Sequence, residues 1–316
     1  MLSLLISYAY MKPKMLDFVK ATQGSVRWLL DCGAFTAHMR GVEIDLDEYI
    51  DFTTEHGHLF WQYVALDKVG NATGTQKNLD KMRASGLNPM PVLTIDEDVQ
   101  VAQTITDDTC KHLCVAGGVS ERIELFGPRL AEVRDAVGKD VWLHGLGFAR
   151  GMRVASTHVD SVDASSWMSG FRWGNFTWFD QTAGIQNIGW KDALSKEWKD
   201  LPAGMRETMV GMGLTRADLT DPMVGRGSMT MLGLVSTYAY FRYAASLQQR
   251  GVRFIFPVGN TKDAACVLIA ANHATEVGVP WKKARPDSQN YREIVKEPTK
   301  YAEQAAANVQ RIWGLE

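Results

Sequence analysis

Short apolar segments rich in β-branched and aromatic residues recur along the chain, and each is followed by a helix-like pattern. Eight such segments occur, at residues 4–9, 27–35, 63–67, 91–95, 112–119, 141–148, 161–164 and 253–258. Apolar residues at helical spacing predict helices at 47–56, 75–85, 98–105, 120–137 and 262–276. Continuous apolar strands that alternate with helices indicate a parallel sheet covered on both faces. Eight strands of this kind predict an α/β fold in which residues 1–316 form a single (β/α)8 TIM barrel.

The regular alternation breaks down between the seventh and eighth strands, where residues 168–233 form a large insertion. This segment is rich in tryptophan, and its four indoles are Trp173, Trp178, Trp190 and Trp198. In such a barrel, the loops that follow the carboxyl ends of the strands carry function. The insertion is therefore expected over the barrel mouth, as a lid or a nucleic-acid-contacting subdomain. The tail, residues 279–316, is expected to add a helix to the flank of the barrel.

Composition narrows the class of protein without identifying it. The chain has 34 Lys plus Arg and 36 Asp plus Glu, a net charge of −2, which excludes a histone-like polycation. Hydrophobic residues make up 46% and charged residues 22%, as in a folded protein with a large core. Four scattered cysteines favour a reducing cytoplasm, which is the host cytoplasm if the chain is viral. Residues 1–10 are expected to form a strand and not a signal peptide, and no membrane association is expected.

Three aspartates stand where predicted strands end. Asp31 and Asp163 lie within apolar runs, and Asp67 closes the third strand. A buried carboxylate must be paired, hydrogen-bonded or functional, because desolvating an unpaired one costs several kcal/mol. Two carboxylates that face one substrate can divide into a nucleophile and a general acid/base, as in retaining glycoside hydrolysis or in base exchange on a nucleoside. The alternative is that each one caps the next helix or pairs with an arginine.

Glycines and single aromatic or imidazole groups lie beside these strand ends. Gly118 and Gly145 belong to glycine clusters after strands five and six, where a bare backbone can approach a planar ligand or form a tight turn. His144 is interpreted either as a ligand contact or as a hydrogen-bonded histidine of the core. Phe35 is interpreted either as a ring that stacks on a base or as one that fills the barrel. The glycine spacing does not match a dinucleotide fingerprint.

Metal binding and hydrolase chemistry find little support in the sequence. Cys110 and Cys114 have no nearby second pair, so structural thiols are favoured and no metal is expected. The chain also lacks the GxSxG elbow of a serine hydrolase.

Five strand-end motifs, taken together and in order, resemble those of a known family. They are LLDCGAF, VALDKVG, CVAGGV, LHGLGF and SVDASSW. The set resembles the tRNA-guanine transglycosylase superfamily, and most of all its DNA-acting branch, the DpdA-type 7-deazaguanine transglycosylases. The resemblance covers about residues 2–167 and 253–275. It implies a (β/α)8 barrel that exchanges guanine for a 7-deazaguanine such as 7-cyano-7-deazaguanine.

The resemblance also implies roles for individual residues. Asp163 matches the nucleophile that attacks C1′ of a guanosine, and Asp31 in DCGAF matches the residue of acid/base chemistry. Phe35 matches the aromatic that stacks on the base, and Asp67 the aspartate that reads the guanine edge.

Backbone contacts to the base are implied for the fifth and sixth strands. Gly118 and Val119 match the family's backbone contacts. His144, followed by Gly145, stands where the family usually has an apolar stacking residue. The resemblance implies a double displacement, in which Asp163 displaces guanine from C1′ and a 7-deazaguanine then displaces Asp163. No redox cofactor is expected, and the 7-deazaguanine is a substrate and not a cofactor.

Two departures from the family favour DNA over tRNA as the substrate. The tRNA enzymes carry a cysteine-rich zinc site after the seventh strand, whereas this chain has no cysteine between Cys114 and Cys266. Structural zinc is therefore not expected. Asp163 is followed by Ala-Ser-Ser-Trp where the tRNA enzymes have Cys-Val-x-Pro-Thr-Arg. The expected partners are DNA and the free base, and a homodimer or an accessory protein is compatible with the sequence.

An enzyme that reaches a base inside a duplex must flip it out, which calls for aromatic wedges and phosphate clamps. The insertion supplies such residues, namely Arg172, Trp173, Trp178, Phe179, Arg206, Arg216 and Arg226. The alternative is that its tryptophans form a small core. Competing functions are the same exchange on tRNA, a catalytically inert barrel that binds nucleic acid, and a glycoside hydrolase.

Overall fold

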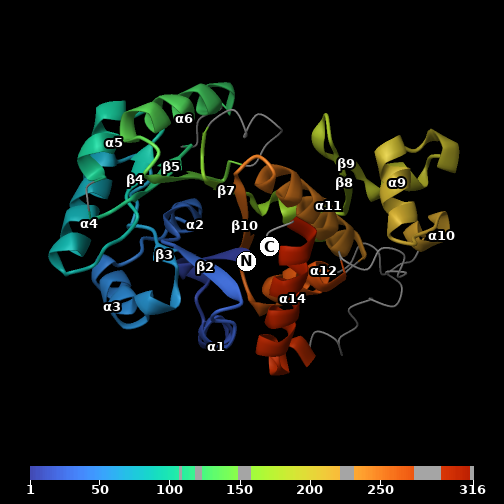
Figure 1. Ribbon diagram of the computed structural model, residues 1–316, viewed down its shortest axis with the longest axis horizontal. Coiled ribbons are helices and arrows are strands. Elements are labelled where there is room, and N and C mark those ends of the chain that lie inside the picture. The colour runs from blue at the N-terminus through green and yellow to red at the C-terminus, as the bar shows by residue number, and fades with distance from the viewer. Residues whose placement is uncertain (107–108, 118–122, 149–157, 221–230, 274–292, 314–316) are drawn as a thin grey trace.

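The computed structural model describes residues 1–106, 109–117, 123–148, 158–220, 231–273 and 293–313. Within these ranges, eight parallel strands form one curled sheet in the order β3-β2-β1-β10-β7-β6-β5-β4 (Figure 1). The strands are β1 (Leu2–Ser7), β2 (Val26–Asp31), β3 (Gln62–Tyr63), β4 (Val92–Thr94), β5 (His112–Ala116), β6 (Trp142–Leu146), β7 (Ser161–Asp163) and β10 (Arg253–Val258). Each overlaps one of the eight apolar segments, so the predicted α/β fold with a parallel sheet is confirmed.

The sheet curls far enough for its two edges to touch. Val64, just after β3, and Met90, just before β4, form a single parallel bridge. Two backbone hydrogen bonds accompany it, from Ala65 N to Met90 O at 2.9 Å and from Met90 N to Tyr63 O at 2.8 Å. This arrangement is consistent with a (β/α)8 barrel, although the two edges meet at one bridge and not along a full ladder.

Helices cover the outside of the curled sheet (Figure 1). Those that follow the strands are α1 (Pro13–Ala21), α2 (Ala34–Met39), α3 (Leu46–His56), α4 (Ala72–Ala84), α5 (Val99–Ile105), α6 (Ile123–Val137), α11 (Met231–Gln248), α12 (Thr261–His273) and α14 (Pro298–Trp313). The predicted terminal helix is α14, which packs on α12. Among the described residues, no helix is both long enough and apolar enough to cross a membrane.

Short polar side chains fix where several of these helices begin. The Asp45 carboxylate accepts hydrogen bonds from the first backbone amides of α3, and Asp98 accepts one from Gln100 N at the start of α5. Asn71 accepts one from Gly74 N at the start of α4. Each cap satisfies amides that have no partner inside the helix, and so it ends the preceding loop at a defined residue.

The two faces of each strand pack differently. Phe256 of β10 stacks on Phe241 of α11 with ring centroids 4.9 Å apart, so this face of the sheet lies under the helices. Residues one position away point to the opposite face, which is the inner face of the curled sheet. Asp31 and Asp163, the central residues of the candidate site, lie on that inner face.

The segment between β7 and α11 adds short helices and a hairpin whose buried side chains belong to the same hydrophobic core as the sheet. It contains α7 (Ser169–Trp173), the antiparallel hairpin of β8 (Asn175–Asp180) and β9 (Gly184–Gly189), α8 (Trp190–Leu194), α9 (Ala203–Gly211) and α10 (Arg216–Leu219). The hairpin packs on α11 and α9, and Figure 1 shows it on the side of α11 away from β1 to β6. Residues 221–230, with Arg226, lie outside the described residues. The expected cover over the strand ends stays a prediction.

Two tryptophans of this segment have opposite environments. Trp178 on β8 is only 8% exposed and belongs to the hydrophobic core. A Cβ added to Gly204 of α9 would lie 2.6 Å from its Cδ1 atom, so the indole fills the space that this glycine leaves. Trp173 at the end of α7 is 75% exposed. For Trp178, the alternative of a small core therefore holds, and Trp173 is the indole available to a ligand.

Replacing Trp178 with alanine should lower the free energy of unfolding by about 3–5 kcal/mol, because it removes a large buried ring and leaves a cavity. The matched control is Trp173→Ala, which removes the same side chain from an exposed position and should change stability by less than about 0.5 kcal/mol. Denaturant unfolding of the two variants measures the difference. Equal losses would contradict the assignment of Trp178 to the core.

Candidate functional site

The strand register brings the predicted aspartates together on the inner face at the carboxyl end of the sheet. Ser7 of β1 pairs with Asp31 of β2, and two residues before Ser7, Leu5 pairs with Pro257 of β10. Two residues before Pro257, Ile255 pairs with Asp163 of β7. Because side chains two residues apart share a face, Ser7, Asp31 and Asp163 all point inward. The same argument places His144 there, since it pairs with Ser161, two residues before Asp163.

Asp31 is a carboxyl group whose pKa is raised toward neutral pH. Burial, followed by the negative charge of Asp163, raises the pKa of Asp31 to about 6. Gly33 N donates a hydrogen bond to Asp31 Oδ2 at 3.1 Å, and this bond, the Ser7 hydroxyl and His144 partly offset the increase. A carboxyl group with such a pKa exchanges a proton readily near neutral pH, which is what general acid/base catalysis requires.

Asp163 is held as an acceptor. It is 8% exposed, and Gly147 N donates a hydrogen bond to its Oδ1 at 2.7 Å. His144 Nε2 lies 3.3 Å from the same oxygen. Gly147 has a φ of 67°, a left-handed conformation that favours glycine and that turns its amide toward the carboxylate. The hydrogen bond from Gly147 fixes the orientation of the Asp163 carboxylate.

A hydrogen-bonded chain below Asp163 sets the tautomer of His144. Trp142 Nε1, which can only donate, bonds to Ser161 Oγ at 2.9 Å. Ser161 Oγ lies 2.8 Å from His144 Nδ1. The Asp163 carboxylate oxygen 3.3 Å from Nε2 favours a hydrogen on that nitrogen, so Nδ1 is the acceptor and the Ser161 hydroxyl donates its proton to it. The Nε2–H lies on the side of Asp163.

Two buried polar atoms beside the carboxylates have no hydrogen-bond partner. They are His144 Nε2, whose position near Asp163 lacks hydrogen-bond geometry, and Ser7 Oγ, which is close enough to Asp31 to lower its pKa but is also poorly aligned. Buried polar groups in folded proteins are nearly always satisfied. Two unsatisfied atoms around one carboxylate pair indicate a site built for a polar ligand.

The glycine of DCGAF is explained by close packing at this end of β1. Gly33 has a φ of 85°, and a Cβ at this position would lie 2.7 Å from Ser7 Oγ and 2.9 Å from Ala9 N. The turn therefore brings the backbone of residue 33 against β1, where its amide can reach Asp31. A side chain would push Ser7 away from the carboxylate.

The remaining predicted site residues are more scattered. Thr75 Oγ1 donates to Asp67 Oδ1 at 2.7 Å and accepts from Lys68 N, so Asp67 is bound to the first turn of α4, whose cap is Asn71. Phe35, at the first turn of α2, is 58% exposed and does not fill the barrel. Gly145 is buried within β6. Gly118 and Val119 lie outside the described residues.

Sequence reasoning missed the residues that orient the predicted ones. The sequence analysis did not single out Ser7 or Ser161, and it included Gly147 only as a member of the glycine cluster after strand six. Hydroxyl residues inside apolar strands gave a usable signal for Ser7 and Ser161, because such strands have no packing reason for a serine. The amide of Gly147 has no sequence signal of its own.

The cysteines do not suggest reactive thiols or a metal centre. All four are buried thiols outside any disulfide, and burial raises the pKa of the Cys32 and Cys114 thiols and raises that of Cys266 to about 12. Within the described part of the chain, no three His, Cys, Asp or Glu side chains are grouped as a metal site. The groups of this site that can carry out proton transfer or nucleophilic attack are the Asp31 and Asp163 carboxyl groups.

The shifted pKa of Asp31 predicts a pH-dependent stability. The unfolded chain releases this proton near pH 3.8 and the folded protein only near 6, so the stabilisation by the protonated form is lost as pH rises through 6. Asp31→Asn, which cannot ionise, should therefore gain up to about 3 kcal/mol of unfolding free energy relative to wild type between pH 4 and pH 7. Denaturant titrations at both pH values, with exposed Asp51→Asn as control, measure this gain. A pH-independent difference would contradict the shift.

The tautomer of His144 is open to a direct test. Nitrogen NMR of the imidazole should show a protonated Nε2 and an unprotonated Nδ1 in the wild type. Ser161→Ala removes the donor to Nδ1 and should produce a mixture of tautomers, whereas the exposed Ser165→Ala should leave the spectrum unchanged. A protonated Nδ1 in the wild type would refute the hydrogen-bonded chain.

No protein-family model matches the chain, and no curated protein matches its sequence. The interpretation of the site therefore depends on its own geometry. Its main features are two inward-facing carboxyl groups at the ends of β2 and β7. The pKa of Asp31 is raised to about 6, and Asp163 accepts a hydrogen bond from Gly147 N. Two polar atoms without a hydrogen-bond partner, Ser7 Oγ and His144 Nε2, lie beside them.

Proposed function

We propose that the protein is a transglycosylase that replaces guanine in DNA with a 7-deazaguanine, such as 7-cyano-7-deazaguanine, through a covalent intermediate on Asp163. The observation that carries this proposal is the pair Asp31 and Asp163. Two carboxyl groups close enough to interact, one with a raised pKa and the other accepting a backbone hydrogen bond, are the arrangement that divides the work between an acid and a nucleophile.

The first half of the reaction would use both residues at once. An Asp163 carboxylate oxygen attacks C1′ of the deoxyguanosine, and the bond from C1′ to N9 of guanine breaks. Protonated Asp31 gives its proton to the leaving guanine. A pKa of about 6 supports this role, because an appreciable fraction of Asp31 is protonated near neutral pH. The products are a glycosyl ester on Asp163, free guanine and the Asp31 carboxylate.

The second half would reverse these roles on a new base. The Asp31 carboxylate takes the N9 proton of the incoming 7-deazaguanine, and N9 attacks C1′. The bond from C1′ to the Asp163 oxygen breaks, which returns both carboxyl groups to their starting states. Neither half needs a redox cofactor, and the covalent ester preserves the configuration at C1′ overall, as in retaining glycoside chemistry.

The unsatisfied polar atoms fit a nucleoside substrate. His144 Nε2–H is fixed in tautomer and lies beside the nucleophile, so it can donate to an oxygen of the nucleotide without first breaking another bond. Ser7 Oγ is available in the same way beside Asp31. These atoms argue against a catalytically inert barrel, because an inert core has no reason to leave them unpaired.

The proposed fold is a complete (β/α)8 barrel, in which catalysis occurs at the carboxyl ends of the strands. Asp31 and Asp163 both stand at those ends. The contact between Val64 and Met90 is where such a barrel would close. Phe35, exposed beside Asp31, is then free to stack on a base.

Contact with DNA is proposed for Arg172 and Trp173. Both are exposed on α7, which follows the strand that carries Asp163. An exposed indole and a guanidinium there suit a wedge and a phosphate clamp for a flipped base. Trp178 and Phe179 are buried, and the Arg206 and Arg216 guanidiniums donate to backbone carbonyls within the insertion, so these four residues are left out. A cytoplasmic location and a homodimer are part of the same proposal.

The test is incorporation of labelled guanine or 7-cyano-7-deazaguanine into duplex DNA and, in parallel, into unmodified tRNA. Wild-type protein should label DNA, and Asp163→Asn should reduce incorporation by at least about 10³-fold, because the nucleophile is lost. Asp51→Asn, an exposed change of the same kind on α3, should retain activity. Label confined to tRNA would replace the DNA proposal with the tRNA one, and near-normal activity of Asp163→Asn would refute the mechanism.

A further inference from the structure

The inner face of the sheet carries a second polar cluster at its amino end, opposite the carboxylates. Arg27 of β2 pairs with Ser3 of β1, and these two residues point inward because Asp31 and Ser7 lie four positions further along the same strands. Arg253 begins β10 and pairs with Ser161, so it also faces inward. Since β1 lies between β2 and β10, Ser3 stands between the strands of the two arginines.

Aromatic rings hold the two guanidiniums in place. The Arg27 guanidinium lies 5.2 Å from the centroid of the Trp61 ring, and that of Arg253 lies 5.0 Å from the Trp142 ring. The two indoles contact each other edge to face, with centroids 5.2 Å apart. Such stacking restricts the arginines without using their N–H donors. The donors therefore stay available in a fixed arrangement.

These positive charges are not neutralised by the protein. Neither arginine forms an ion pair with a described residue, and Arg253 Nη1 is buried without a hydrogen-bond partner. Burial and then the charge of Arg27 lower the pKa of Arg253 to about 10. Asp160 lies near enough to oppose this effect, but its carboxylate already accepts hydrogen bonds from Arg134 and from Leu143 N.

A serine adds a second buried donor without a partner. Ser3 is 1% exposed, and its Oγ has no hydrogen-bond partner. A buried hydroxyl between two strands that each carry an unpaired arginine has no structural explanation within the described residues. It is explained if a negatively charged ligand completes the cluster.

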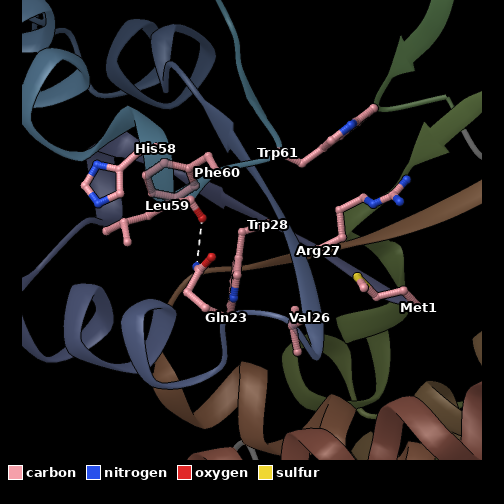
Figure 2. Close-up of a pocket in the computed structure, with 9 residues that line it drawn as sticks. All are labelled: Met1, Gln23, Val26, Arg27, Trp28, His58, Leu59, Phe60 and Trp61. Atoms are coloured by element: carbon pink, nitrogen blue, oxygen red, sulfur yellow. Dashed lines mark hydrogen bonds between the residues drawn. The ribbon is translucent and has the colours of Figure 1, made fainter.

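A cavity open to solvent lies beside Arg27, the member of the cluster that lines it. It has a volume of about 220 Å³ and lies at the amino ends of β1 and β2, lined by residues that include Arg27, Trp61, Met1, Gln23 and Phe60. Figure 2 shows Arg27, Trp61 and Met1 on one side of the pocket and His58 and Leu59 on the other. Gln23 Nε2 donates a hydrogen bond to the Leu59 carbonyl across the pocket. Arg27 is the arginine of the lining.

We propose that this end of the sheet binds a tetrahedral oxyanion, phosphate or sulfate, between Arg27 and Arg253, with Ser3 as an additional donor. Guanidinium groups match the oxygens of such ions with paired hydrogen bonds. The bound anion would also remove the repulsion between the two arginines. This site is independent of the base-exchange chemistry, because it lies at the opposite end of the strands from Asp31 and Asp163.

The experiment is calorimetric titration of the full chain with inorganic phosphate in a chloride buffer of constant ionic strength. Wild type should bind phosphate saturably with one site per chain. Arg27→Gln and Arg253→Gln should each weaken binding about tenfold or more, because each removes charge-assisted hydrogen bonds. The matched control, Arg250→Gln, removes an exposed arginine three residues before Arg253 and should bind as wild type does.

Thermal unfolding separates loss of the site from loss of the fold. Without phosphate, both glutamine variants should be at least as stable as wild type, since each removes one of two repelling charges. With phosphate at about 100 times the wild-type Kd, Tm should rise by about 4 °C for wild type and by about 2 °C or less for the variants. A parallel titration with guanosine 5′-monophosphate shows whether the phosphate is taken free or on a nucleotide. Absence of saturable binding, equal binding of acetate, or unchanged binding in both variants would overturn the proposal.

Discussion

The repulsion between the Asp31 and Asp163 carboxylates is the constraint on which the functional end of the molecule depends. Two acids on one inner face cannot both be charged without cost, and the protein resolves this by giving them different surroundings. Asp163 accepts a hydrogen bond from the Gly147 amide, whereas burial and the charge of Asp163 raise the pKa of Asp31 to about 6. The left-handed turns at Gly33 and Gly147 supply the amides that make this division possible.

The inner face of the sheet is polar at both ends and hydrogen-bonded in between. Carboxylates occupy the carboxyl end, and unpaired guanidiniums occupy the amino end. Between them, Trp142 contacts Arg253 through its ring and Ser161 through its Nε1, and Ser161 in turn contacts His144. The residue that stacks on the proposed anion site thus also begins the chain that sets the tautomer beside the nucleophile. The two ends are physically connected, although the proposals for them are tested separately.

The strands, and with them the two aspartates that we propose as catalytic, followed from the sequence because each depends on a local signal. Eight apolar runs gave the sheet, and a carboxylate that ends an apolar run is costly enough to stand out. The difference between Trp173 and Trp178 could not be predicted, since it depends on Gly204, which is distant in sequence and leaves room for only one of them. The cluster of Arg27, Ser3 and Arg253 joins strands from the two ends of the chain, and only the register reveals that they share a face.

The central claim is that Asp163 forms a covalent bond to the deoxyribose, and trapping that bond tests it most directly. Protein incubated with end-labelled DNA and no free base, then denatured and resolved on a gel, should show a protein–DNA adduct. Peptide mapping should place the bond on Asp163, and adding 7-cyano-7-deazaguanine before denaturation should discharge the adduct into modified DNA. The account would be contradicted by an adduct on another residue. It would also be contradicted if exchange were efficient while Asp163 formed no adduct and could be substituted without loss of activity.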